Sequence, residues 1–172
     1  MRRTVRLLAG LALLVSLAGC GDGPAATGED QDLATLRSLT APYRNFDAGK
    51  AAGYNAPFMG CFANDSGAMG IHYQNPAIDL KGTPAVPKPP FLMYEPRQDG
   101  TMELVGVEYV KDAPPTDPAP MLFDQQFTYN TGLKIWALHV WAWKDNPAGL
   151  YASWNPNVTC RFAPQTAAMA HH

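Results

Sequence analysis

The sequence contains none of the short motifs that mark the common nucleotide-dependent and hydrolytic enzymes. A glycine-rich phosphate loop ending in Gly-Lys-Ser/Thr, a Gly-x-Gly-x-x-Gly turn and a Gly-x-Ser-x-Gly nucleophile elbow are all missing. Basic residues are also few, because the 172 residues include 13 Lys and Arg against 15 Asp and Glu. A nucleic-acid-binding surface requires the opposite balance. These absences set aside most enzyme classes, and we expect no nucleic-acid partner.

The longest apolar stretch, residues 7–17, is too short to span a membrane as a helix, which takes about 20 residues. It follows Arg2, Arg3 and Arg6, and a basic start before a short apolar run is typical of a secretory signal. We therefore expect residues 1–19 to be a signal peptide. Without them the chain has 10 basic and 15 acidic residues, a formal charge of −5.

Cysteine is scarce, and the first of the three closes the sequence Leu17-Ala18-Gly19-Cys20. This sequence resembles the lipobox of bacterial lipoproteins. The resemblance implies that Cys20 carries lipid as the mature N-terminus, and two or more acyl chains give stable anchoring. Ordinary signal cleavage nearby is the alternative, but it leaves Cys20 as an odd thiol in an oxidising compartment.

The same resemblance implies an extracytoplasmic protein whose partner is the membrane, through its lipid. In a host with two membranes, an Asp after the lipidated cysteine favours the inner membrane. Gly21 stands there instead, so the outer membrane is favoured. Small and acidic residues dominate 20–32, which predicts a flexible tether spanning about 20 Å.

The other two cysteines, Cys61 and Cys160, are predicted to form a disulfide bond. Two thiols in an extracytoplasmic domain most simply pair with each other. The bond closes a loop of about 100 residues, for which the chain-entropy model gives up to about 4–5 kcal/mol. Two buried free thiols, or a thiolate metal ligand, are the alternatives.

The segment from Leu33 to Phe46 carries apolar residues in steps of three and four, which predicts a helix. Pro42 interrupts it, so we expect either two short helices or one whose second part begins near Thr40 to Pro42. Gly49 and Gly53 are natural C-terminal stops.

Beyond this segment, short β-type runs alternate with turns. The runs are residues 69–74, 91–95, 102–110, 121–129, 133–143 and 158–162. Two connections with four prolines each, residues 82–90 and 112–120, are predicted to be surface loops. The fold class is therefore α+β: one domain over residues 33–165, with an N-terminal helical segment on a mostly antiparallel sheet of five to seven strands. Residues 166–172 form a tail.

Asp99-Gly100 predicts a hairpin between two of these runs, with Thr101 paired to either Gln98 or Pro96. Both registers give the same two faces. One face carries Glu95, Leu104, Gly106 and Glu108, and the other, the expected core face, carries Tyr94, Val105, Val107 and Tyr109. Glu95 and Glu108 lie too far apart along the ladder to bind one ion.

Histidine is scarce as well, and outside the tail only His72 and His139 remain. If their strands are neighbours, both converge with Glu108. Two imidazoles and one carboxylate suit Zn, Mn, Fe or Cu and leave coordination positions open. A divalent transition metal at His72, Glu108 and His139 is the candidate cofactor. The alternative, favoured by the lack of diagnostic spacing, is two histidines hydrogen-bonded within the sheet and Glu108 on a solvated face.

Strand alternation also places Trp141 and Trp143 on one face with His139. Two tryptophans on one face can form a ligand-binding platform for a sugar ring or a flat apolar molecule. Residence in the core is the favoured interpretation.

Much of the chain from residue 43 to residue 160 resembles a group of bacterial secreted hypothetical proteins. The likeness is carried by Gly60-Cys61, Met69-Gly70-Ile71-His72-Tyr73-Gln74-Asn75-Pro76, Leu104-Val105-Gly106-Val107-Glu108-Tyr109 and Leu138-His139-Val140-Trp141-Ala142-Trp143-Lys144-Asp145-Asn146-Pro147. It implies secretion and carries over no catalytic residue. Cupins also combine a small β fold with His and Glu ligands, but they cluster two histidines as His-x-His, whereas His72 and His139 stand alone.

The sequence therefore predicts a lipid-anchored cell-envelope protein with a small-ligand or metal pocket near His72, Glu108 and His139. A non-catalytic interaction or scaffold lipoprotein is the alternative, and a metal-dependent enzyme comes third. No residue is assigned a catalytic role.

Overall fold

The computed structural model describes residues 27–164, which form two helices, a short 3-10 turn and an antiparallel sheet. This is the predicted α+β class. The predicted signal peptide, the lipobox-like sequence that ends at Cys20, most of the predicted tether and the histidine-bearing tail lie outside the described residues. Within residues 27–164, none of the helices has the length and apolar character that crossing a membrane requires.

The first helix, α1 (Gly28–Thr40), begins five residues before the predicted start. Its cap is Thr27, whose side-chain oxygen accepts a hydrogen bond from the Asp30 N–H at 3.2 Å. The Asp30 carboxylate in turn accepts the Thr27 N–H at 3.1 Å. This reciprocal pair satisfies two N–H groups that a helix start leaves free. Residues 28–32, assigned to the tether, are therefore helical.

Pro42 ends this helix as the two-helix alternative predicts. The chain passes through a 3-10 turn, η1 (Ala41–Arg44), and resumes as α2 (Phe46–Ala51). Asn45 caps α2, because its side chain accepts the Ala48 N–H at 3.1 Å. The chain leaves this helix through Gly53, whose φ of +102° suits glycine.

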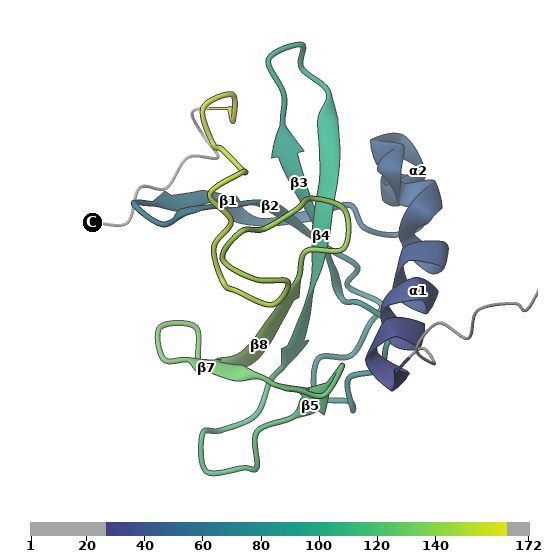
Figure 1. Ribbon diagram of the computed structural model, residues 1–172, viewed down its shortest axis with the longest axis vertical. Coiled ribbons are helices and arrows are strands. Elements are labelled where there is room, and N and C mark those ends of the chain that lie inside the picture. The colour runs from purple at the N-terminus through teal and green to yellow at the C-terminus, as the bar shows by residue number, and fades with distance from the viewer. Residues whose placement is uncertain (1–26, 165–172) are drawn as a thin grey trace, which may run out of the picture.

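Six antiparallel strands form one curled sheet in the order β1-β2-β3-β4-β8-β7. They are β1 (Ala56–Asn64), β2 (Gly67–Gln74), β3 (Phe91–Pro96), β4 (Met102–Lys111), β7 (Thr128–Asn130) and β8 (Ile135–Val140). A separate pair consists of β5 (Met121–Leu122) and β6 (Gln125–Gln126). Figure 1 shows the curl, because β1 and β2 run across the view while β3 and β4 run along it.

Three strand predictions were wrong. β1 was missed, because a proline and a glycine within it interrupt the β-type pattern. The run 121–129 is broken at Phe123 and Asp124, which both take positive φ (53° and 54°) and turn the chain back on itself. The run 158–162 forms turns instead of a strand. The two proline-rich loops contain neither helix nor strand, as predicted.

The β3–β4 hairpin differs from both predicted registers. Its loop closes where the Arg97 N–H donates to the Thr101 carbonyl at 2.8 Å, so Pro96 pairs with Met102. Further along, Tyr94 pairs with Leu104 but Met93 pairs with Gly106. One extra residue of β4, at Val105, is thus accommodated as a bulge.

The bulge reverses part of the predicted face assignment. Leu104 packs with Tyr94 and Tyr109 in the main core, and Val105 packs with Met93 on the opposite face. The prediction was therefore wrong for Leu104 and Val105. Beyond the bulge the alternation resumes, so Glu108 still shares the face opposite the core.

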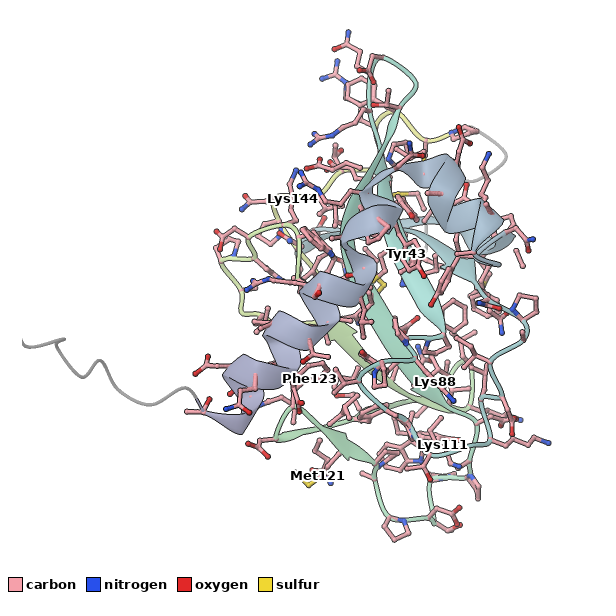
Figure 2. All side chains as sticks on the ribbon, turned by 90° about the vertical axis from the view of Figure 1, so that its right-hand side faces the viewer. Tyr43, Lys88, Lys111, Met121, Phe123 and Lys144 are labelled. Atoms are coloured by element: carbon pink, nitrogen blue, oxygen red, sulfur yellow. A yellow bond between two sulfur atoms is a disulfide. The ribbon has the colours of Figure 1, made fainter. Side chains whose placement is uncertain are left out.

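The main core lies between the helices and the sheet. Leu36 of α1 is fully buried there, and Tyr43 packs at its edge. Figure 2 looks onto this side, with α1 crossing in front of the strands and Tyr43 and Phe123 labelled beside it.

The last segment, residues 141–164, covers part of the other face of the sheet without forming a strand of its own. Asn155 and Ala68 exchange two backbone hydrogen bonds of 3.1 Å. The predicted disulfide joins Cys61 of β1 to Cys160, with a Cα–Cα distance of 5.6 Å. Cys160 therefore anchors a turn, not the final strand that was predicted.

Candidate metal centre

Strand register places His72, Glu108 and His139 on one face of the sheet, opposite the helices. Glu108 lies directly across from His139 in the β4–β8 ladder and from Phe91 in the β3–β4 ladder. His72 pairs with Met93, two residues from Phe91 on β3. Residues paired across an antiparallel ladder, and residues two apart on a strand, point to the same face.

The curl of the sheet brings the two histidines together. β3 and β4 lie between β2, which carries His72, and β8, which carries His139. Three strand spacings amount to about 14 Å in a flat sheet. The two Nε2 atoms are nevertheless 3.4 Å apart. Without this curvature the two imidazoles would not meet.

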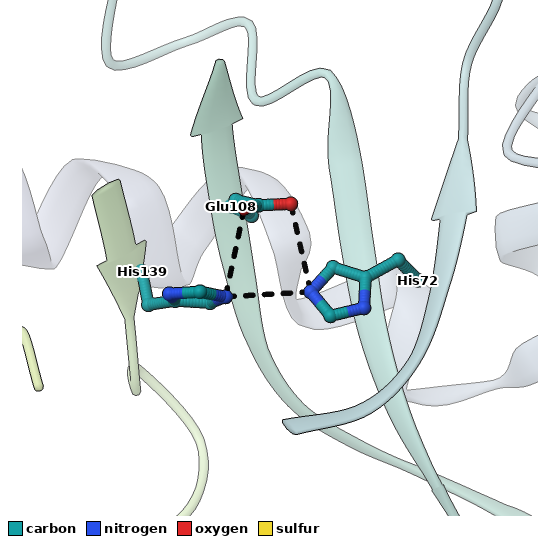
Figure 3. Close-up of side chains that lie close together, drawn as sticks. All are labelled: His72, Glu108 and His139. Carbon is teal, nitrogen blue, oxygen red and sulfur yellow. Dashed lines mark hydrogen bonds and ion pairs between the residues drawn. The ribbon is translucent and has the colours of Figure 1, made fainter. Parts of the chain in front are cut away.

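The three side chains converge on one point (Figure 3). His72 Nε2 is 3.5 Å from Glu108 Oε2, and His139 Nε2 is 3.6 Å from Glu108 Oε1. Hydrogen bonds between such atoms measure about 2.7–3.2 Å, so all three contacts are long for direct bonds. Two ligands of a tetrahedral zinc ion, each about 2.0–2.1 Å from the metal, lie about 3.3–3.4 Å apart. The spacing therefore matches a coordination shell better than a hydrogen-bonded cluster.

Burial holds this cluster neutral at neutral pH when no ion is bound. Side-chain exposure is 4% for His72, 8% for His139 and 12% for Glu108. Burial raises the pKa of Glu108 to about 8. It lowers the pKa of His139 to about 4 and, with a contribution from His139, that of His72 to about 3. Neutral imidazoles are the form that binds metal.

Aromatic rings surround the two histidines. The His139 ring stacks on Trp141, with centroids 6.1 Å apart and planes at 14°. The rings of Phe62 and Phe91 meet His72 edge to face, at 6.4 Å and 6.3 Å. No local motif marks either phenylalanine, so the sequence alone does not place them at the site.

A bulge in β1 places Phe62 beside His72. Phe58 pairs with His72 and Phe62 with Gly70, so four residues of β1 advance against two of β2. Met59, within the bulge, has a φ of +59°, which is strained for a non-glycine residue. The bulge ends at Phe62, next to disulfide-bonded Cys61.

The second nitrogen of His72 is unpartnered. Nδ1 is buried and has no hydrogen-bond partner among residues 27–164. Metal-ligating histidines usually donate this second N–H to a carboxylate, a carbonyl or water. The outer shell of the candidate centre is therefore incomplete at His72.

The predicted tryptophan platform does not form. β8 ends at Val140, so the alternation stops before the two tryptophans. Trp141 is 2% exposed, in the cluster with Met93, and its Nε1 donates to the Ala152 carbonyl at 2.6 Å. Trp143 packs on the opposite side of the sheet, against the main core. The core interpretation holds for Trp141.

Glu95 belongs to a separate group, as the sequence predicts. Its carboxylate is buried and accepts hydrogen bonds from Lys144 Nζ at 3.0 Å and from the Thr159 N–H at 2.9 Å. Arg97 lies 3.6 Å away. This carboxylate is fully engaged in holding the C-terminal segment.

Two surface cavities of the described chain lie elsewhere. One, of about 530 Å³, is lined by residues that include Arg44, Glu103 and Trp143. The other, of about 490 Å³, lies along the first proline-rich loop and includes Asp79 and Lys88. Neither is lined by a member of the His72, Glu108 and His139 cluster. These two cavities are therefore separate from the cluster.

Comparisons with protein-family models, with curated proteins and with solved structures gave no match.

Proposed function

We propose that this protein is a metal-binding lipoprotein of the cell envelope, which holds a divalent transition metal ion at His72, Glu108 and His139. The observation that carries the proposal is the set of 3.4–3.6 Å spacings among the ligand atoms of three different strands. A fortuitous hydrogen-bonded cluster would contract to shorter distances. The neutral imidazoles need no deprotonation before they bind.

The donor set favours zinc, iron or copper over calcium or magnesium. Imidazole nitrogen suits the borderline transition metals, whereas calcium and magnesium take oxygen ligands. With three protein ligands, a tetrahedral ion keeps one position open. That position accepts water or one donor atom of a small molecule.

The envelope location rests on the sequence. Leu17-Ala18-Gly19-Cys20 resembles a lipobox, and the Cys61–Cys160 disulfide is of the kind that forms outside the cytoplasm. With α1 beginning at Gly28, a short tether of residues 21–26 remains between the proposed lipid and the helix cap.

Elemental analysis tests the metal. The full mature chain is purified in detergent with His171 and His172 both changed to Ala, which removes adventitious ligands in the tail. It is compared with the same chain carrying His72→Ala and His139→Ala after loading with Zn²⁺. About one equivalent of zinc in the first and none in the second supports the proposal. No zinc in either chain, and no iron or copper after loading with those ions, overturns it and leaves a scaffold lipoprotein as the account.

Radiolabelled palmitate tests the anchor. Wild-type chain expressed with the label should incorporate it and partition into detergent, while Cys20→Ser should do neither. Equal behaviour of the two chains would refute lipidation at Cys20 without affecting the metal proposal.

A further inference from the structure

We infer that the centre is an exchange site, which takes up its ion as transient cargo, and that His72 is the ligand that makes the ion easy to release. The inference rests on the proposed function. It is supported by the unpartnered Nδ1 of His72, by the aromatic rings around that histidine and by a fold that does not depend on the ion.

Metal binding fixes the position of the proton on the His72 ring. The atom that faces the centre is Nε2, so binding a metal there requires the proton of the neutral ring to sit on Nδ1. Nδ1 is buried, and no described residue accepts a hydrogen bond from it. The metal-bound form therefore buries an N–H with no acceptor, which is costly.

The metal-free form avoids this cost. With the proton on Nε2, that N–H still has acceptor atoms of Glu108 and His139 in reach, although at 3.5 Å and 3.4 Å these contacts are long, and Nδ1 needs no donor. The two forms of the centre thus favour opposite tautomers of His72. Each binding event requires the His72 proton to move from Nε2 to Nδ1 and the Glu108 carboxyl proton to leave to solvent, and each release reverses both.

Among the described residues, no carboxylate or carbonyl accepts a hydrogen bond from His72 Nδ1. The rings of Phe62 and Phe91 meet the imidazole edge to face. Outer-shell partners of ligating histidines typically contribute about 10–100-fold in metal affinity. A centre that lacks one at His72 binds correspondingly less tightly.

The fold does not depend on the ion. β2, β4 and β8 are already joined through backbone ladders, and both faces of the sheet carry packed side chains. A structural zinc site, by contrast, supplies the folding energy of its domain. Glu108, the most exposed of the three ligands, gives the ion an edge at which to enter and leave.

Two measurements test the inference on the full mature chain with the His171→Ala and His172→Ala tail, loaded with Zn²⁺. The first follows zinc release into excess EDTA by atomic absorption, with circular dichroism recorded in parallel. We expect release within minutes and an unchanged spectrum. Zinc that stays bound for hours, or release only with loss of the fold, overturns the inference.

The second measurement is two-bond ¹H–¹⁵N correlation spectroscopy of the histidine rings, with His72→Ala used to assign the signal. His72 should carry its proton on Nε2 without zinc and on Nδ1 with it. A proton on Nδ1 in both states overturns the tautomer switch. If zinc does not bind at all, the proposed function itself fails, whereas zinc that binds and stays refutes only the exchange.

Discussion

Glu108 of β4 lies directly opposite His139 of β8, and this pairing places the carboxylate of one strand beside the imidazole of the next. The pairing depends on close approach of the two strands near Gly106. A Cβ at that position would lie 2.5 Å from the Val140 carbonyl oxygen and 2.8 Å from Met93 Cε. Only a residue without a side chain fits there.

Gly106→Ala should therefore weaken zinc binding while all three ligands remain. Forcing β4 away from β8 should cost about 1–3 kcal/mol of stability and lower zinc affinity at least about tenfold. Urea unfolding and zinc titration measure the two effects. Gly28→Ala is the matched control, because a Cβ there meets no atom within 4 Å. Wild-type zinc affinity in Gly106→Ala would show that the strand spacing does not set the site.

In the metal-free protein, the contribution of His72, Glu108 and His139 to the free energy of unfolding should be greatest near pH 6.5. Above pH 6.5 the folded chain keeps a proton on Glu108, whose pKa is about 8, and the unfolded chain does not. Stability therefore falls as pH rises to 8, by about 1.4 kcal/mol per pH unit. Urea unfolding in EDTA across this range checks the slope.

Between pH 4.5 and 6.5 the slope of stability against pH has the opposite sign. The two histidines, with folded pKa values of about 3 and 4, are protonated only in the unfolded chain. Their two protons outweigh the one on Glu108, so stability rises with pH. Glu108→Gln should abolish the fall above pH 6.5 and steepen the rise below it. A variant curve parallel to that of the wild type would contradict the raised pKa.

Lys144→Met should destabilise the fold by about 2–3 kcal/mol, because it removes the closest cation from the buried Glu95 carboxylate. Lys88→Met serves as the control, since Lys88 is exposed, and should change stability by less than about 0.5 kcal/mol. Both lysines are labelled in Figure 2. Thermal unfolding compares the two variants, and equal melting temperatures would mean that Arg97 alone compensates Glu95.

Replacing both Cys61 and Cys160 by Ser should cost about 2–5 kcal/mol, because the bond constrains a loop with a sequence separation of 99. The loss should also loosen the β1 bulge that holds Phe58 and Phe62 beside His72. Denaturant unfolding gives the first effect. A reduced wild-type chain measured in parallel separates loss of the bond from the effect of the serines.

The sequence predicts those elements whose causes are local. Pro42 predicts the break between the helices, the alternation of β3 and β4 predicts their strands, and two cysteines outside the signal predict one bond. The two candidate histidines also follow from scarcity, since His72 and His139 are the only histidines among the described residues.

The remaining features arise from longer-range geometry. The bulge at Val105 depends on a three-residue loop and on Gly106, and no local pattern marks it. The prediction therefore assigned Leu104 and Val105 to the wrong faces of the sheet. The curl that brings His72 to His139 across two intervening strands is a property of the whole sheet. The end of β8 at Val140 separates Trp141 from Trp143, which alternation alone would keep together.

The disulfide has a further consequence for proteolysis. Cys61 and Cys160 close a covalent ring that contains both proline-rich loops, residues 82–90 and 112–120, and all three proposed ligands. A protease that cuts either exposed loop therefore leaves the fragments joined. The nicked chain would keep its histidines and its glutamate on one molecule, migrate as one species without reductant, and separate into two only when the bond is reduced.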